Sequence, residues 1–239
     1  MLITSLDNRK VKEWTKLHQK KYRQDEYLLL YEDLVKSAYD NGYLKTLVYV
    51  DKPPFEFANS YEVSREVLDK IAKKEGLTCI GVGRHIDQKR SSSKRVIILD
   101  HLQDPLNIGR IMESAALFGF DDVILSTQSA DIYHDKCLKA SKGAIYSLNI
   151  SIHDLTSIIP ILKEEGYEIL ATGLKAHSKE LYEVETAEKM AIILGNEGSG
   201  VREEVMAISD EVVKIDMHNI DSLNVAMAGA ILMHRFKKI

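Results

Sequence analysis

The stretch "ILDHLQDPLNIGRIMESAALFGF", residues 98–120, decides the fold class of this chain. It begins as a short apolar strand, passes through a polar turn, and continues with apolar residues at helical spacing. A strand that leads directly into a helix is typical of α/β proteins. Asn107, Arg110 and Glu113 lie just after this strand. They are candidate functional residues, because ligands of such sheets bind beyond the carboxyl ends of the strands.

Four more apolar strands are expected after this one, and helical patterns separate most of them. The five expected strands are residues 95–100, 122–126, 167–173, 190–196 and 212–217. Short, nearly continuous apolar strands that alternate with helices predict an α/β fold with a parallel sheet covered by helices on both faces.

The residues before the first of these strands predict a smaller unit of mixed α/β type. Their pattern indicates a helix over 8–24, strands at 27–32, 44–50 and 78–83, and a helix near 64–75. A polar, basic and serine-rich segment then separates the two parts, as a linker does. The sequence therefore predicts a first domain at 1–87, a linker at 88–95 and a second domain at 96–239.

Charge is distributed unevenly between these parts. Residues 1–94 carry 18 Lys and Arg against 14 Asp and Glu, whereas the rest of the chain carries 14 against 22. The formal net charge is −4, so the basic side chains concentrate in the first part of an acidic protein.

Cysteine usage and hydropathy indicate a cytoplasmic protein. Cys79 and Cys137 have no partners at metal-ligand spacing, so we expect reduced thiols, with no disulfide and no structural zinc. The first residues carry charge too early for a signal peptide, and no apolar run reaches the roughly 18 residues of a membrane span.

Two further loops carry candidate site residues. "GNEGSGV", residues 195–201, holds three glycines around Glu197, which lets the backbone approach a ligand closely. Its spacing matches neither the dinucleotide fingerprint nor the Walker loop. "HNIDSLNV", residues 218–225, precedes a helix rich in small residues. The structural alternatives are a flexible helix start for the first loop, a helix N-cap for Ser222 and a solvated first-turn position for Asn224.

Three segments together resemble the signature motifs of the SpoU family of RNA ribose 2′-O-methyltransferases. They are "DPLNIG", "ILGNEGSGV" and "IDMHNIDSLNVAMAGAIL", in the order of the family. "ITSLDNRKVKEWTKLHQKKYR" is similar to the start of the small substrate-binding domain of that family. "KASKGAIYSLNI", residues 139–150, resembles a further family element. The resemblance extends over essentially the whole chain.

This resemblance implies a trefoil knot in the second domain, an S-adenosylmethionine site within it, a homodimer and no metal. The cofactor residues that it implies are Thr172, Gly173, Gly195, Ile215, Met217 and Leu223. Asn107, Glu197, Ser222 and Asn224 would face the acceptor ribose, with Arg110 and Glu113 beside them. The RNA-binding candidates in the basic first domain are Arg9, Lys10, Lys12, Lys16, Lys20, Lys21 and Arg23.

Glu113 departs from the family pattern. The first motif of the family reads Asn-x-Gly-x-x-x-Arg, and "NIGRIME" has Glu113 at the position of that Arg. Glu113 could accept the hydroxyl proton, Arg110 could take over the contact to an RNA phosphate, or methyl transfer could have been lost. Arg110 and Glu113 could also form an ordinary surface ion pair.

Alternatives from other classes stay open at this point. One is a catalytically silent relative that binds RNA or cofactor. Another is an unrelated α/β nucleotide-binding enzyme, and a third is a knotted methyltransferase that modifies a base. The Ser-Leu-Asn-Val motif favours the ribose, and the first domain favours rRNA over tRNA as the substrate.

Overall fold

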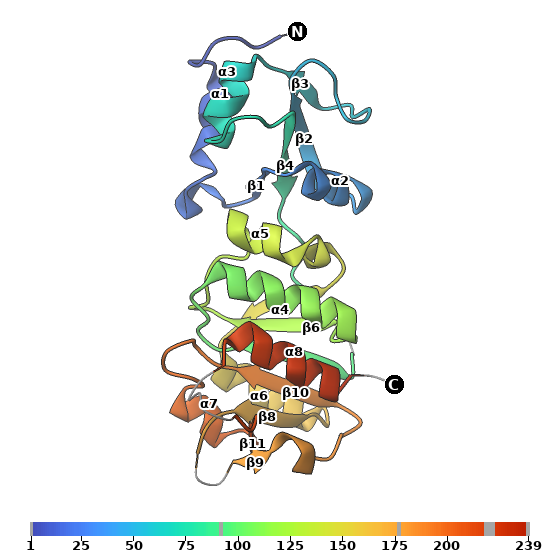
Figure 1. Cartoon of the computed structure of the whole chain (residues 1–239), viewed down its shortest axis with the longest axis vertical. Coiled ribbons are helices and arrows are strands. Elements are labelled where there is room, and N and C mark those ends of the chain that lie inside the picture. Colours follow the sequence, from blue (N-terminus) through green and yellow to red (C-terminus); the bar gives the residue numbers. More distant parts are fainter. Residues whose placement is uncertain (1, 91–92, 176–177, 218–222, 238–239) are drawn as a thin grey trace. The chain divides into compact units, whose positions relative to one another are not determined.

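The computed structural model describes residues 2–90, 93–175, 178–217 and 223–237, and its contacts divide the chain into two compact units (Figure 1). The first unit comprises residues 1–86 and 131–146, and the second comprises 87–130 and 147–239. No helix in the described part of the chain is long and apolar enough to cross a membrane.

The first unit is a mixed four-stranded sheet with helices. Its strand order is β1 (Glu26–Leu29), β4 (Cys79–Arg84), β2 (Leu44–Tyr49) and β3 (Ser60–Glu62), and only the β2–β3 pair is parallel among the described pairs of this sheet. The helices α1 (Arg9–Lys16), α2 (Glu32–Asp40) and α3 (Arg65–Ala72) accompany it. Apolar residues of α1 and α3, such as Val11, Trp14 and Leu68, pack with Val48 and Ile80 of the sheet.

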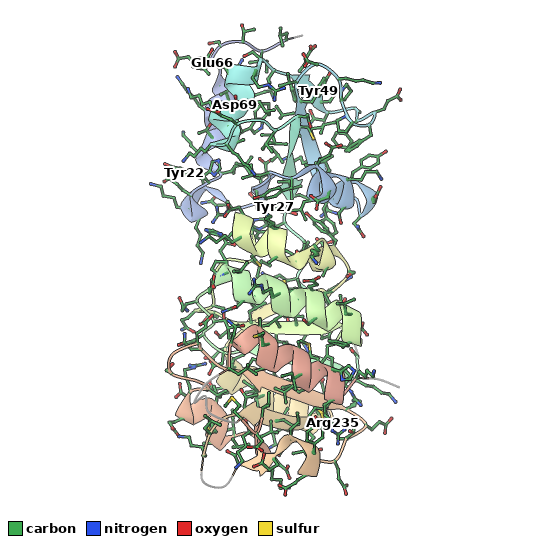
Figure 2. The ribbon with its side chains drawn as sticks, in the orientation of Figure 1. Tyr22, Tyr27, Tyr49, Glu66, Asp69 and Arg235 are labelled. Carbon is green, nitrogen blue, oxygen red and sulfur yellow. The ribbon has the colours of Figure 1, made fainter. Side chains whose placement is uncertain are left out.

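Residues 131–146 belong to this first unit, although they follow a strand of the second. They form α5 (Asp135–Ser141) and the short 3-10 helix η2 (Ala144–Tyr146). At one end, Arg23 forms an ion pair with Asp131, with 2.7 Å between Nη2 and Oδ2. At the other end, the hydroxyls of Tyr27 and Tyr146 lie 2.9 Å apart and are buried (Figure 2 labels Tyr27). The domain boundaries expected from the sequence did not place residues 131–146 in the first unit.

The second unit contains a seven-stranded parallel sheet. Its order is β7 (Asn149–His153), β6 (Asp122–Ser126), β5 (Arg95–Leu99), β10 (Met190–Leu194), β8 (Glu168–Thr172), β11 (Glu211–Lys214) and β9 (Lys179–Glu180). Among the described residues of this unit, the sheet is covered by the helices α4 (Pro105–Phe118), α6 (Leu155–Glu164), α7 (Glu203–Ala207) and α8 (Val225–Arg235). This arrangement confirms the α/β class with a parallel sheet.

Alternation of side chains along the strands builds two apolar layers. Ile98, Ala191 and Ile193 share one layer with Ile159 of α6 and Val205 of α7. The intervening residues point to the other face, where α4 and α8 lie beside each other in front of the sheet (Figure 1). Both faces are therefore covered, which explains why β5, β6 and β10 are buried along their whole length.

Several elements differ from those expected. The first helix ends at Lys16 rather than near residue 24, because Arg23 folds back and donates from Nη1 to the carbonyls of Leu17 and His18. The helix α2 was not expected, and Glu32, expected as the last residue of a strand, is its first residue. The edge strands β7 and β9 were not expected, because they lack a continuous apolar run. Arg95, which was expected both as the last linker residue and as the first residue of a strand, is the first residue of β5.

We expect Arg23→Met to lower the free energy of unfolding by about 3 kcal/mol, because it leaves the carboxylate of Asp131 without its charged partner. The two side chains are only 7% and 13% exposed. Lys12→Met is the matched control, because the Lys12–Asp7 pair is 54% and 88% exposed and should change stability by less than about 1 kcal/mol. Urea unfolding of both variants measures the difference, and equal effects would contradict the role of Arg23.

Candidate functional site

The carboxyl ends of the central strands surround an open pocket of about 380 Å³. Loops that follow β8, β10 and β11, together with the start of α8, form its walls. The structure brings to this one pocket all six residues expected to hold a cofactor: Thr172, Gly173, Gly195, Ile215, Met217 and Leu223. Its volume lies within the range of small-molecule sites.

Gly195 is required by the close approach of two backbone segments. A Cβ atom at this position would lie 2.1 Å from the backbone N of Val201 and 2.2 Å from the carbonyl carbon of Gly200. The loop closes through two backbone hydrogen bonds between Asn196 and Gly200, of 3.0 and 2.9 Å. The glycines of "GNEGSGV" therefore let the loop fold back sharply at the edge of the pocket.

Asn196 fixes this loop against the loop that follows β5. Its Nδ2 donates to the carbonyl of His101 at 2.8 Å, and its Oδ1 accepts from the N–H of Gly198 at 2.9 Å. His101 has a φ of 55°, in the left-handed region. The side chain of Asn196 therefore joins the glycine loop to the loop that follows β5.

Sequence reasoning missed a buried ion pair below the same loops. Asp100, the residue directly after β5, is fully buried. Its Oδ1 accepts a hydrogen bond from Nε of Arg202 at 2.8 Å. Its Oδ2 accepts from the backbone N–H of Arg202 at 2.9 Å. A carboxylate directly after the apolar run "RVIIL" was the available signal, since a buried charge requires a partner. This pair holds the far end of the glycine loop.

Hydrogen bonds join three of the catalytic candidates, Asn107, Glu197 and Asn224. The Asn107 side chain is 3% exposed on the first turn of α4. Its Nδ2 donates to Oε1 of Glu197 at 3.1 Å, and its Oδ1 accepts from Nδ2 of Asn224 at 3.1 Å. Residues from the loops after β5, β10 and β11 therefore meet in one hydrogen-bonded chain.

The carboxylate of Glu197 also accepts two backbone hydrogen bonds from the loop after β5. The donors are the N–H groups of Gln103 at 3.3 Å and Asp104 at 3.2 Å. Burial by itself would raise the pKa of Glu197, but the hydrogen bonds from its own backbone, from Asn107 and from this loop outweigh burial and lower the pKa. Glu197 is therefore an ionised acceptor at neutral pH.

Asn224 is the N-cap of α8, where its Oδ1 accepts from the N–H groups of Ala226 and Met227. Asn224 is exposed, as its structural alternative stated, but it is the N-cap and not a first-turn residue. The helix begins two residues later than an N-cap at Ser222 would place it. Ser222 lies outside the described residues. Because the Oδ1 of Asn224 caps the helix, its amide is oriented with Nδ2 toward Asn107.

Comparison with known proteins identifies the family. A model of the SpoU rRNA Methylase family matches residues 94–234. The chain is also 30% identical to the 23S rRNA (guanosine(2553)-2′-O)-methyltransferase RlmP of Bacillus subtilis, over 98% of both sequences. The chain belongs to the SpoU rRNA Methylase family. Membership confirms the resemblance drawn from the three motifs and makes this chain an RNA methyltransferase.

Two solved structures share the fold of this SpoU-family chain. The AdoMet-bound rRNA methyltransferase from Sinorhizobium meliloti is 24% identical and matches with a TM-score of 0.87, over 98% of this chain and 96% of its own. The SpoU methyltransferase AviRb from Streptomyces viridochromogenes, solved in complex with AdoMet, is 18% identical with a TM-score of 0.82, over 95% and 96%. These matches confirm the α/β architecture over nearly the whole chain.

Arg110 and Glu113 follow Asn107 along α4 at intervals of three residues. Arg110 is exposed, whereas Glu113 is half-buried. Within the described residues Arg110 makes no ion pair, so the surface pair with Glu113 is not formed. Because residues three apart share a helix face, Arg110 lies on the same side of α4 as Asn107.

The seven RNA-binding candidates of the first unit divide into three groups. Arg23 is turned inward to Asp131, so the structure argues against its contact with RNA. Arg9 and Lys12 are exposed but pair with Glu13 and Asp7. Exposed lysines without an ion pair among the described residues make up the third group: Lys10, Lys16, Lys20 and Lys21. Lys16 and Lys21 lie 5.6 and 4.9 Å from the ring of Tyr22, which lies at the surface (Figure 2).

We expect Glu197→Gln to destabilise the protein at pH 7, with a difference from the wild type that shrinks as the pH falls. Because the native pKa of Glu197 is below its ordinary value of 4.5, its ionised form contributes stability that is fully present above pH 4.5. That contribution is lost as the pH falls through the lower native pKa.

Urea unfolding at pH 7, and at intervals from about pH 5 to about pH 3, measures this difference. Glu164→Gln, at the exposed end of α6, is the control and should show no such trend. A Glu197→Gln effect that stays constant over this range would contradict a lowered pKa.

Proposed function

We propose that this chain transfers a methyl group from S-adenosylmethionine to a ribose 2′-hydroxyl of ribosomal RNA. The observation that carries the proposal is the Asn107–Glu197–Asn224 network beside the pocket. The RlmP relative, which is named as a 2′-O-methyltransferase of 23S rRNA, supports both the ribose and the rRNA. An intact network also argues against a catalytically silent relative.

S-adenosylmethionine binds in the pocket formed by the loops after β8, β10 and β11. The pocket fits such a cofactor, because apolar side chains such as Leu194, Ile215 and Leu223 line it beside exposed backbone. The missing Cβ of Gly195 allows its wall to close. The cofactor supplies a methyl group that its sulfonium already activates.

Residues of the chain position the acceptor nucleotide and interact with its hydroxyl group. Glu197 stays ionised and accepts hydrogen bonds, so it orders the loops around the ribose and can accept a hydrogen bond from a hydroxyl. Asn107 fixes the orientation of that carboxylate relative to Asn224. Precise placement of donor and acceptor accounts for a large part of the rate of such a transfer.

Arg110 takes the role of the missing family Arg and contacts an RNA phosphate. Its guanidinium is exposed and makes no ion pair with a described residue. A guanidinium matches the geometry of a phosphate, which the carboxylate of Glu113 would repel. Glu113 as the proton acceptor is the alternative.

The second unit forms a trefoil knot and pairs with a second copy of the chain. The return of α8 from β11 to pack beside α4 is compatible with such a knot. These two helices expose large apolar side chains, with Leu117 72%, Met227 60% and Ile231 39% exposed. Exposed apolar area on two adjacent helices supports a homodimer interface.

The remaining assignments concern the domains and the compartment. The first unit binds the RNA through the lysines on and after α1 that form no ion pair with a described residue, and the second unit carries out the transfer. We place the protein in the cytoplasm, where ribosomal RNA is available to an enzyme whose cysteines are free.

We expect the wild type to form a 2′-O-methylated nucleoside in rRNA that has been incubated with labelled S-adenosylmethionine. Gly195→Ala should abolish transfer and cofactor binding, because its Cβ would overlap backbone atoms of the loop. Gly198→Ala is the matched control, because its Cβ would meet only Asn196 Oδ1, at 3.6 Å.

Digestion of the product to nucleosides locates the methyl group, and isothermal titration measures cofactor binding. A methyl group on a base would refute the ribose assignment. Cofactor binding without transfer to rRNA would refute rRNA as the substrate or indicate a silent relative, and transfer to tRNA in the same assay separates these two.

We expect Arg110→Ala to lower kcat/KM for RNA about tenfold or more, because it removes a charge-assisted contact to a phosphate. Glu113→Gln should change kcat/KM by less than about threefold, because its carboxylate is not the proton acceptor. Steady-state kinetics of both variants decide the question. A larger loss for Glu113→Gln than for Arg110→Ala would assign the proton to Glu113.

A further inference from the structure

The first unit places two lysines over one tyrosine ring, and neither of them belongs to α1. Tyr31, the residue before α2, has the ammonium of Lys74 4.9 Å and that of Lys139 4.6 Å from its ring centroid. Lys74 lies just after α3, and Lys139 lies on α5. Three elements far apart in the sequence therefore converge on one aromatic ring.

Tyr31 provides a rigid base for these charges. Its ring is partly buried and packs against the apolar cluster of the first unit, which includes Leu28, Leu30 and Ile71. Both lysines are exposed. A cation over an aromatic face is attracted by the ring quadrupole, so the Tyr31 ring attracts both ammonium groups.

No carboxylate of the described residues neutralises either ammonium. Lys74 and Lys139 form no ion pair within the described part of the chain. Glu32, which follows Tyr31, instead accepts a hydrogen bond from the hydroxyl of Thr78 at 3.3 Å. Two like charges held near one ring repel each other unless an anion lies between them or beside them.

Another lysine and tyrosine pair in the same unit has a neutralised ammonium group. Lys36 lies 5.5 Å from the ring centroid of Tyr39, and its ammonium is paired with Asp40. The Tyr39 ring also contacts Phe55 and Phe57. The charge of Lys36 is neutralised and the ring of Tyr39 contacts other aromatic rings, so this pair needs no further anion.

We propose that Tyr31, Lys74 and Lys139 form a phosphate-binding site for the backbone of the RNA substrate. This inference rests on the proposed function, because it takes RNA as the anionic partner. Lys136 extends the basic surface along α5, one turn before Lys139. The spacing of several cations over adjacent elements suits the repeated charges of a polynucleotide better than a single small anion.

The origin of Lys139 distinguishes this site from the lysines on α1. Lys139 belongs to the segment between β6 and β7 of the methyltransferase sheet, yet that segment packs with the first unit. It also begins the "KASKGAIYSLNI" element, whose role the catalytic network does not explain. The RNA site is therefore built from residues on both sides of the expected linker.

The test is the salt dependence of RNA binding by the full-length protein. With a 23S rRNA transcript as the probe, the slope of log Kd against log salt concentration should fall by about 1 to 2 in the double variant Lys74→Gln with Lys139→Gln. Lys36→Gln, which removes the same charge from the neutralised pair, should leave the slope unchanged. Equal slopes for the wild type and the double variant would overturn the proposal, and so would an equal loss in Lys36→Gln.

Variants of Tyr31 test whether its ring contributes to RNA binding. Tyr31→Phe keeps the aromatic face and should bind RNA as the wild type does, whereas Tyr31→Leu should reproduce part of the loss. Thermal unfolding of both variants identifies any loss that comes from misfolding. Equal RNA affinity for Tyr31→Leu and Tyr31→Phe would show that the ring has no part in binding.

The two proposals fail in different ways. If the wild type transfers methyl groups to rRNA but the double variant keeps its slope, the phosphate site is refuted and the proposed function stands. If the wild type transfers no methyl group to RNA while the double variant shows the lower slope, the proposed function is refuted and the phosphate site stands.

Discussion

The buried amide of Asn107 is the interaction on which the site depends. One side chain donates to Glu197 and accepts from Asn224, so it connects the start of α4, the glycine loop after β10 and the N-cap of α8. An aspartate could not donate to the carboxylate when ionised, and an aliphatic residue could do neither. Because the amide is almost fully buried, leaving its own donor or acceptor unsatisfied would also cost desolvation energy.

Two further constraints make this network rigid. Gly195 lets the backbone of the glycine loop return to within contact of its own start, and the buried Asp100–Arg202 pair holds the other end of that loop. The Asn196 amide then fixes the loop to the carbonyl of His101. The pocket wall is thus determined by backbone contacts and buried polar groups, which can hold the residues of a site in place before a ligand binds.

The sequence predicted those parts that carry a continuous local signal. β5, β6, β8, β10 and β11 are short apolar runs buried on both faces, so their positions followed from hydropathy. Asn107, Glu197 and Asn224 followed from motifs. The Asp100–Arg202 pair spans 102 positions, and the inward turn of Arg23 depends on Asp131, 108 positions away. Such partners are determined by the tertiary fold, and no spacing rule in a single sequence identifies them.

The assignment of residues 131–146 to the first unit is also determined by the tertiary fold, and it has a functional consequence. The Arg23–Asp131 pair lies at the start of the segment and the Tyr27–Tyr146 hydrogen bond at its end, so the contacts of the first unit determine the position of α5. Lys139 is thereby held over Tyr31 rather than on the methyltransferase sheet whose strands flank it in sequence. A linear division of the chain into a binding domain and a catalytic domain would miss this cation. The division drawn from contacts assigns it to the unit whose lysines are proposed to meet the RNA backbone.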